Sequence, residues 1–148
     1  MNLLKNINVK HVLDPIAAAN NTDSNSSRLD MQGFEGVIFI VPVTDCTSGS
    51  VVTLTVEHNT SGNDSDTGMA AATGATATAT STAGDDLNGK LLVVDCYRPR
   101  YRYVQGVITT ATQNAAIGNM IAIQYSERKM PITQGTTVKA STQVISPA

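Results

Sequence analysis

The chain has 148 residues, which is enough for one domain with a modest core. It contains ten Lys and Arg residues against twelve Asp and Glu residues, for a net charge of −2. A domain whose main task is to hold nucleic acid normally has a clear positive excess, because counterion release drives that binding. The charge balance therefore argues against a nucleic-acid partner, although it allows a local basic patch.

The residue types favour strands over long helices. Thr, Ala, Ser, Gly and Val are abundant, charged residues make up only 15% of the chain, and Trp is absent. The β-branched residues are common in strands, whereas stretches rich in Leu, Glu and Lys are missing. No run approaches the roughly 20 apolar residues of a membrane span, and the N-terminal residues lack a secretory signal pattern. We therefore expect an all-β protein with no membrane partner.

The first 22 residues predict an extended N-terminal arm. Residues 16–21 allow one helical turn, but Pro15 and the pair Asn20 and Asn21 oppose a longer helix. A cluster of turn-forming residues follows at 22–27. Residues 23–148 are expected to form a single β-sandwich domain.

Two strands are predicted next in the chain. The segment "GVIFIVPV" (36–43) is apolar at successive positions, which is typical of a strand covered on both faces. Pro42 cannot donate a ladder hydrogen bond, so it indicates an edge or a bulge. In "SVVTLTVEH" (50–58), Val52, Leu54 and Val56 alternate with polar residues, which predicts a half-buried strand.

The second half of the chain predicts further strands. Alternating Ala and Thr at 70–80 favour a strand with a small-residue face, with a low-complexity linker as the alternative. More strands are predicted over 87–97, 102–112 and 117–125, and one or two weaker ones within 131–147. Short strands at this spacing predict a β-sandwich or small barrel of about eight strands.

The two cysteines are expected to be reduced. Cys46 and Cys96 are fifty residues apart, without a CxxC motif or a neighbouring pair of histidines. Two buried thiols are favoured over one disulfide for a protein made in a reducing cytoplasm. The sequence leaves open whether the two residues lie close together.

No pattern of catalytic or metal-binding residues is present. His58 ends a predicted strand on its inward side, which favours a structural histidine, and neither it nor His11 has metal-ligand spacing. Asp64 and Asp66 resemble a fragment of a calcium loop, but the glycine and distal glutamate of an EF-hand are missing, so a solvated loop is favoured. No GxSxG, HExxH or P-loop motif occurs. We expect a non-enzymatic protein without a metal or cofactor.

The segment "DCYRPRYRYVQGVITTAT" (95–112) concentrates arginine and tyrosine. If it is extended, its side chains alternate between two faces, with the tyrosines on one and the arginines on the other. A platform for single-stranded nucleic acid needs both on the same surface, so this pattern argues against one. The arginines are predicted to pair with carboxylates of this chain or of a partner; a solvated basic face, a protein interface and a polyanion site stay open. The tyrosines are Tyr97, Tyr101 and Tyr103, and the arginines are Arg98, Arg100 and Arg102.

Residues 95–134 resemble a family of small structural proteins of tailed bacteriophages, the capsid decoration or cement proteins. The family pattern "D-x-Y-x-P-x-x-R-Y-V" is followed by an apolar strand ending in "A-I-Q-Y" and by a basic, proline-containing tail. The similarity covers about a quarter of the chain well, and "GVIFIVPV" fits the early buried strand of the family. The matching positions are Asp95, Tyr97, Pro99, Arg102, Tyr103, Val104, Ala122, Ile123, Gln124, Tyr125, Arg128, Lys129 and Pro131.

The resemblance implies a jelly-roll-like virion protein on the outer surface of a phage capsid, made in the cytoplasm of the bacterial host. It implies two partners, the major capsid protein and further copies of this chain in a dimer or trimer, and a role in stabilising contacts between capsid subunits. The expected interface residues are Arg98, Arg100, Arg102, Tyr97, Tyr101, Tyr103, Arg128 and Lys129.

A β-sandwich binding module of a phage tail or cell surface, for example for carbohydrate, is the alternative. Sugar-binding sites usually expose aromatic rings for stacking. Four Tyr, two Phe and no Trp make this alternative weaker.

Overall fold

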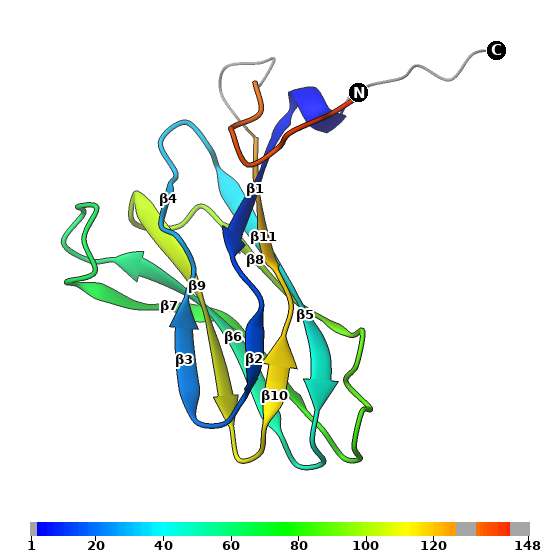
Figure 1. Ribbon diagram of the computed structural model, residues 1–148. Coiled ribbons are helices and arrows are strands. Elements are labelled where there is room, and N and C mark those ends of the chain that lie inside the picture. The colour runs from blue at the N-terminus through cyan, green and yellow to red at the C-terminus, as the bar shows by residue number, and fades with distance from the viewer. Residues whose placement is uncertain (1–2, 127–132, 143–148) are drawn as a thin grey trace.

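Two antiparallel β-sheets pack face to face in the computed structural model, which describes residues 3–126 and 133–142 (Figure 1). A single 3₁₀ turn, η1 (Leu3–Lys5), precedes the strands. The strands are β1 (Ile7–Leu13), β2 (Ile16–Ala19), β3 (Thr22–Asn25), β4 (Leu29–Asp30), β5 (Gly36–Cys46), β6 (Val51–Asn59), β7 (Met69–Thr80), β8 (Leu91–Tyr97), β9 (Tyr103–Ala111), β10 (Ala115–Ile117) and β11 (Met120–Tyr125).

The strand order is that of a jelly roll. In the first sheet, β1 and β2 pair with β11 and β10, these pair with β5, and β5 pairs with β8. In the second sheet, β3 and β4 pair with β9, followed by β6 and β7. When the interrupted strands are joined, each sheet has four strands, and the chain crosses repeatedly between the sheets as in two Greek keys. The predicted all-β, jelly-roll-like sandwich of about eight strands is confirmed.

The core lies between β5 of one sheet and β6 of the other. Phe39 and Val41 on β5, and Leu54 and Val56 on β6, are fully buried, as the alternation along β6 predicts. Gly106 on β9 completes this contact, because a Cβ there would lie 2.8 Å from the Met120 sulfur and 2.9 Å from the Phe39 ring.

The N-terminal residues belong to the first sheet and do not form the predicted arm. Residues 7–19 form β1 and β2, and the predicted helical turn at 16–21 is part of β2. Pro15 interrupts this strand without ending it. Farther along, the Gln134 side chain covers the free edge of β1: its Nε2 donates to the carbonyls of Leu4 and Ile7, and its Oε1 accepts from the Val9 N–H. Partners more than 90 residues away therefore order this segment.

The later strands follow the predictions with two differences. The Ala/Thr stretch forms β7, so the strand is confirmed. The strand predicted over 117–125 is broken at residues 118–119 into β10 and β11. Of the segment 131–147, residues 133–142 contain no strand, and the remainder lies outside the described residues. The described part of the chain has no helix long and apolar enough to cross a membrane.

Both cysteines are free, as predicted, but only Cys46 is buried as expected, whereas Cys96 is half-buried. Cys46 is buried at the end of β5, whereas Cys96 pairs with Val37 near its beginning. Nine residues separate positions 37 and 46 along the strand, which places the two cysteines about 30 Å apart at about 3.3 Å per residue. A disulfide between them is sterically excluded.

We expect Gly106→Ala to destabilise the fold by about 1–3 kcal/mol, the usual cost of adding a methyl group to a packed core. The chemical denaturation midpoint of the variant should fall. Gly84→Ala is the matched control, because no atom lies within 4 Å of its added Cβ and its backbone is not left-handed. Equal midpoints for Gly106→Ala and the parent protein would contradict the packing described above.

Candidate functional site

The arginine–tyrosine segment forms a loop between the two sheets. β8 ends at Tyr97 in the first sheet and β9 begins at Tyr103 in the second, so residues 98–102 must cross the edge of the sandwich. Arg98 has a left-handed backbone with φ of +52°, and Pro99 follows it. The segment is therefore not extended from end to end, because the chain changes sheets there.

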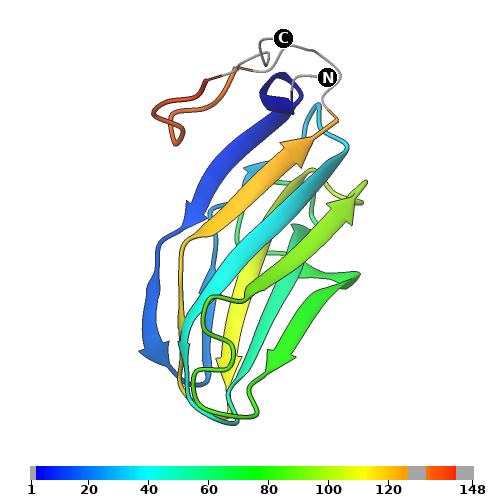
Figure 2. The same cartoon turned by 90° about the vertical axis from the view of Figure 1, so that its right-hand side faces the viewer.

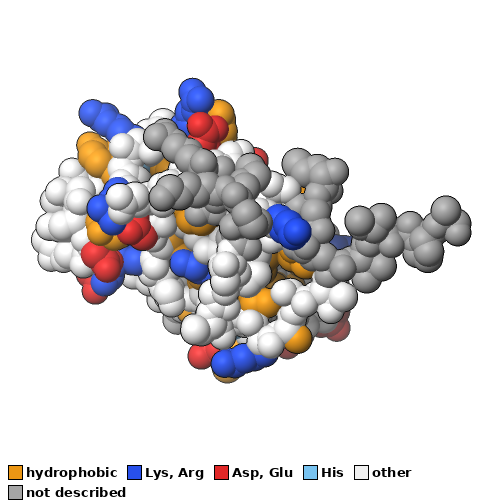
Figure 3. Space-filling model, turned by 90° about the horizontal axis from the view of Figure 1, so that it is seen from above, with side chains coloured by type: hydrophobic (Ala, Val, Ile, Leu, Met, Phe, Trp, Pro, Cys, Tyr) orange, Lys and Arg blue, Asp and Glu red, His pale blue; other side chains and the backbone are white. Residues whose placement is uncertain are grey.

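Arginines and tyrosines share the surface of this loop. Each guanidinium lies over the ring of a neighbouring tyrosine, a favourable cation–π geometry. The predicted separation of tyrosines and arginines onto opposite faces is wrong. The alternation of side chains therefore no longer argues against a nucleic-acid surface. The net charge of −2 still opposes one, and Lys and Arg lie scattered over the end of the molecule seen in Figure 3. The distances from the guanidinium carbon to the ring centroid are 5.1 Å for Arg98 and Tyr97, 5.4 Å for Arg100 and Tyr101, and 5.2 Å for Arg102 and Tyr103.

Two of the three arginines pair with carboxylates of this chain, as predicted. Arg102 donates two hydrogen bonds to Asp30, of 2.8 and 2.7 Å, and these bonds lower the pKa of the Asp30 carboxyl. Arg98 lies 3.8 Å from Glu35, a longer and more exposed contact. Arg100 forms no ion pair with any of the residues that the structure describes.

Tyr125 and Tyr97 meet across β5. The Tyr125 ring lies over Gly36, where a Cβ would be only 2.2 Å from it, and its hydroxyl donates to Asp95 at 2.6 Å. Its ring stacks on that of Tyr97 with centroids 6.5 Å apart. Burial, together with the Asp95 carboxylate, raises the pKa of Tyr125. The aspartate and tyrosines of the family-like pattern thus stabilise the sheet, and only the strand pairing brings them together.

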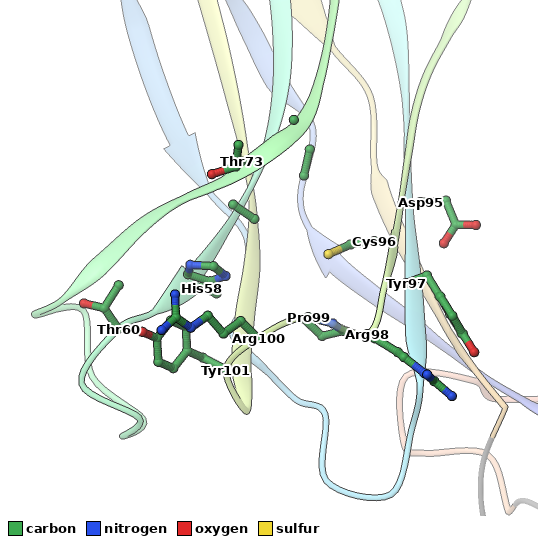
Figure 4. A pocket seen from close by; sticks show the side chains of 13 residues that line it. His58, Thr60, Thr73, Asp95, Cys96, Tyr97, Arg98, Pro99, Arg100 and Tyr101 are labelled. Atoms are coloured by element: carbon green, nitrogen blue, oxygen red, sulfur yellow. The ribbon is translucent and has the colours of Figure 1, made fainter.

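A hollow of about 490 Å³ opens between the 98–102 loop and β7 (Figure 4). It exists because β7 bulges: residues 72–75 lie opposite the single residue Val56 of β6, between the pairs Thr55–Thr76 and Glu57–Ala71. Its lining residues are His58, Thr60, Ala72, Thr73, Gly74, Ala75, Asp95, Cys96, Tyr97, Arg98, Pro99, Arg100 and Tyr101.

His58 lies half-buried in this hollow, as expected for a histidine at the end of an inward-facing row. Its ring meets the edge of Tyr101 with centroids 4.8 Å apart. Burial and then the charge of Arg100 lower its pKa, so the imidazole is neutral at pH 7. Its Nδ1 is buried and has no hydrogen-bond partner among the described residues.

The loop also borders a second hollow of about 520 Å³ on its other side, lined by Met31, Gln32, Phe34 and Glu35 and by the loop itself. The loop is thus a ridge between two concave surfaces. Sequence periodicity cannot reveal this arrangement, because the walls come from β7 on one side and the β4–β5 connection on the other.

The acidic residues of the calcium-like fragment are occupied by an arginine. Arg28 donates to Asp64 at 2.5 Å and also to Asp66. Within residues 3–126 and 133–142, no three His, Cys, Asp or Glu side chains form a group able to hold a metal ion. The favoured interpretation of this stretch as a loop without calcium agrees with this pairing.

The outer face of the first sheet, whose strands lie toward the viewer in Figure 2, is apolar. Four of the five exposed large apolar side chains of the described chain lie on it: Leu91, Val93 and Tyr97 on β8, with exposed fractions of 60%, 48% and 54%, and Ile121 on β11, with 39%. Strand pairing places Ile121 and Val93 on either side of Ile40. The same face is continued by Val9, Ile38, Pro42 and Ile123.

The outer face of the second sheet has the opposite character. Thr53 pairs with Thr78 and Thr55 with Thr76, and hydroxyl hydrogen bonds of 3.1 and 3.4 Å join them. A half-solvated antiparallel sheet normally shows this polar pattern. The outer face of the first sheet lacks this polar pattern and is therefore not typical of a sheet that faces only water.

Two predicted interface residues, Arg128 and Lys129, lie outside the described residues. The structure brings the other six together around the 98–102 loop. It adds four residues that the sequence did not identify as part of this surface: Asp30, Glu35, His58 and Thr73. Of these four residues, only His58 was singled out by the sequence, through its inward position at the end of a predicted strand.

Comparison with known proteins identifies the fold class but no family. No family model and no curated protein matches the chain. The crystal structure of the PBSX exported protein XepA aligns with 99% of this chain at a TM-score of 0.53 and 14% identity. The SPBc2 prophage-derived protein YomS covers 81% of this chain and 93% of its own, at a TM-score of 0.39 and 10% identity. The alignment with the CBM22-1–GH10 modules of the Clostridium thermocellum xylanase Xyn10B covers 95% of this chain and 28% of that chain, at a TM-score of 0.47 and 15% identity.

These identities show a shared fold alone, and the two alignments with TM-scores below 0.5 carry no argument. This chain spans 45% of the XepA chain that it matches. The likeness to XepA agrees with the two-sheet architecture described above.

We expect Arg102→Gln to destabilise the protein in a pH-dependent way. Because Arg102 lowers the pKa of Asp30, the pair contributes stability above the usual carboxyl pKa of about 4, and this contribution is lost as the pH falls through the lowered pKa. The difference in denaturation midpoint between parent and variant should be largest at neutral pH and shrink in acid.

Lys90→Gln is the control, since it removes one exposed positive charge for which no ion pair is found among the described residues. Its effect should not follow the Asp30 titration. A difference for Arg102→Gln that stays constant from pH 7 to strongly acidic conditions would contradict the role of this pair.

Proposed function

We propose that this chain is a non-enzymatic virion structural protein of a tailed phage, which binds the outer capsid surface and stabilises contacts between major capsid subunits. It is made in the cytoplasm of the bacterial host and assembles with further copies of itself. Neither a nucleic acid nor a membrane is a partner in this proposal.

One observation carries the proposal: the uncovered apolar face of the first sheet. Isolated apolar residues on a surface are ordinary, but a contiguous row of Leu, Val, Ile and Tyr marks a surface that another protein covers. The partner proposed for this face is a second copy of the chain. Asp95 lies at one end of this face and accepts a hydrogen bond from Tyr125. The side chains at its centre, Ile40, Val93 and Ile121, carry no charge for a charged partner to complement.

The size of the face is consistent with this occupant. Four strands spaced about 4.8 Å apart, each with about seven residues, span roughly 19 by 23 Å. A surface of this size supplies the apolar centre of a standard interface, which buries about 800 Å² per partner, and the surrounding polar residues supply its rim. The 98–102 loop is then left free to contact the capsid.

Three further points support a phage structural protein. Residues 95–134 resemble the capsid decoration family, and the positions that match it, Asp95, Tyr97 and Tyr125, make structural contacts with one another. The jelly roll suits a protein that binds through its faces and loops, and the fold likeness to the PBSX exported protein XepA agrees with it. Among the described residues, no group of His, Cys, Asp and Glu able to hold a metal ion is found.

The self-association can be tested with Val93→Glu, which places a charge at the centre of the apolar face. Sedimentation or light scattering should show an oligomer for the parent protein and a monomer for the variant, because burying an unpaired carboxylate in the interface is costly. Thr78→Glu adds the same charge to the exposed outer face of the second sheet and should leave the oligomer intact. A monomeric parent protein would overturn this assignment of the face.

The capsid role can be tested with phage particles that lack the protein. Adding back the parent protein should raise the temperature at which the particles release DNA, and Val93→Glu should protect less than Thr78→Glu. Particles of equal heat resistance with and without the protein would exclude the cement function. Specific binding of the protein to neutral glycans, without binding to capsids, would favour the carbohydrate-binding alternative.

A further inference from the structure

Arg100 differs from the other two arginines of the loop. Arg98 and Arg102 face carboxylates of this chain, whereas Arg100 has no ion pair within residues 3–126 and 133–142. Its guanidinium rests on the Tyr101 ring at the border of the hollow between the loop and β7. A guanidinium carries five N–H donors in a planar fork that fits a carboxylate. Arg100 is thus a cation stacked on Tyr101, whose donors have no hydrogen-bond or ion-pair partner among the described residues.

The other polar groups of the hollow complement Arg100. Figure 4 shows Arg100, Tyr101 and His58 grouped on one side of the hollow, with Thr60 and Thr73 nearby. The neutral His58 ring has an unpartnered Nδ1, and no hydrogen bond of the Thr73 hydroxyl is found among the described residues. Thr60 Oγ1 donates its proton to the Gly68 carbonyl at 2.9 Å, so this hydroxyl can only accept a further hydrogen bond.

The other charged side chains that line the hollow, Asp95 and Arg98, extend away from His58. Asp95 lines the hollow but accepts the hydroxyl hydrogen bond of Tyr125, and Figure 4 shows it turned away from His58. Arg98 extends to the same side, where it lies near Glu35. One uncompensated positive charge therefore remains on the His58 side, which suits a singly charged ligand better than a dianion.

The bulge of β7 makes room for such a ligand. Gly74, with φ of +79°, bends the strand, and no side chain or backbone atom lies within 4 Å of the position its Cβ would take. Small-molecule sites commonly enclose about 300–1,000 Å³, and this hollow of about 490 Å³ falls in that range. A single sugar ring or one acidic side chain can enter it.

We propose that this hollow is a carboxylate-binding site, in which Arg100 holds the carboxylate and His58, Thr60 and Thr73 bind the atoms around it. The carboxylate belongs either to an acidic sugar or to a Glu or Asp side chain of a neighbouring protein. The inference rests on the hollow alone and does not depend on the capsid function.

The test is an NMR titration of the full chain that follows the His58 ring signals. His11→Gln identifies the signals, because the chain has only two histidines. The probes are glucuronate and an end-blocked Gly-Glu-Gly peptide, with glucose and the Gly-Gln-Gly peptide as neutral counterparts and inorganic phosphate as the dianion. Each probe is repeated with Arg100→Gln and with Lys90→Gln, which removes a charge at the opposite end of β8.

We expect saturable shifts with at least one carboxylate probe and none with its neutral counterpart. Arg100→Gln should weaken the binding about tenfold or more, the effect of losing a charged hydrogen-bonding group, while Lys90→Gln binds like the parent protein. Saturation by glucuronate alone assigns the site to a sugar, and saturation by the peptide alone assigns it to a protein side chain.

Four results would overturn the proposal: no saturable shift with either carboxylate, equal shifts with the neutral counterparts, tighter binding of phosphate than of both carboxylates, or unchanged binding by a folded Arg100→Gln variant. Circular dichroism melting of each variant establishes that it is folded.

Discussion

Strand β5 is the element on which both sheets of this protein depend. It pairs with β8 along one edge and with β10 and β11 along the other, so the backbone of eleven residues joins the beginning, the middle and the end of the chain. Its side chains alternate between two apolar environments. Phe39 and Val41 point inward and fill the core against β6, whereas Ile38 and Ile40 point outward and form the centre of the exposed face. One strand thus supplies both the stability of the fold and the surface proposed for assembly.

The close packing around β5 also explains two glycines that lie near it. Gly106 allows β9 of the second sheet to approach Phe39, and Gly36 lets the Tyr125 ring lie across the backbone of β5 and reach Asp95. A side chain at either position would separate groups that now touch. Asp95, Tyr97 and Tyr125 lie here and contact one another across the strand.

The loop from 98 to 102 has a different role, because it is free of the ladder that fixes the strands. Crossing between sheets turns its arginines and tyrosines onto one ridge between two hollows. Pairing with Asp30 holds one end of the loop through Arg102, and stacking places Arg100 beside His58. The face of the first sheet and the ridge are thus two neighbouring surfaces, one apolar and one polar, which meet at Tyr97.

The sequence by itself determined the all-β class, the strands at 36–46, 51–59 and 69–80, the absence of a disulfide and the pairing of arginines with carboxylates, because local alternation and residue chemistry carry these features. It did not reveal β1 and β2, since their order comes from β11, β10 and Gln134, more than 90 residues away. Nor did it reveal that the chain changes sheets at 98–102, because a strand pattern does not show which sheet a strand joins. Only the tertiary structure decided that the tyrosines and arginines share one surface, that His58 and Arg100 border a hollow, and that no described residue covers the apolar outer side of β5. The physical reason is the same in each case: these features depend on which distant strands lie side by side.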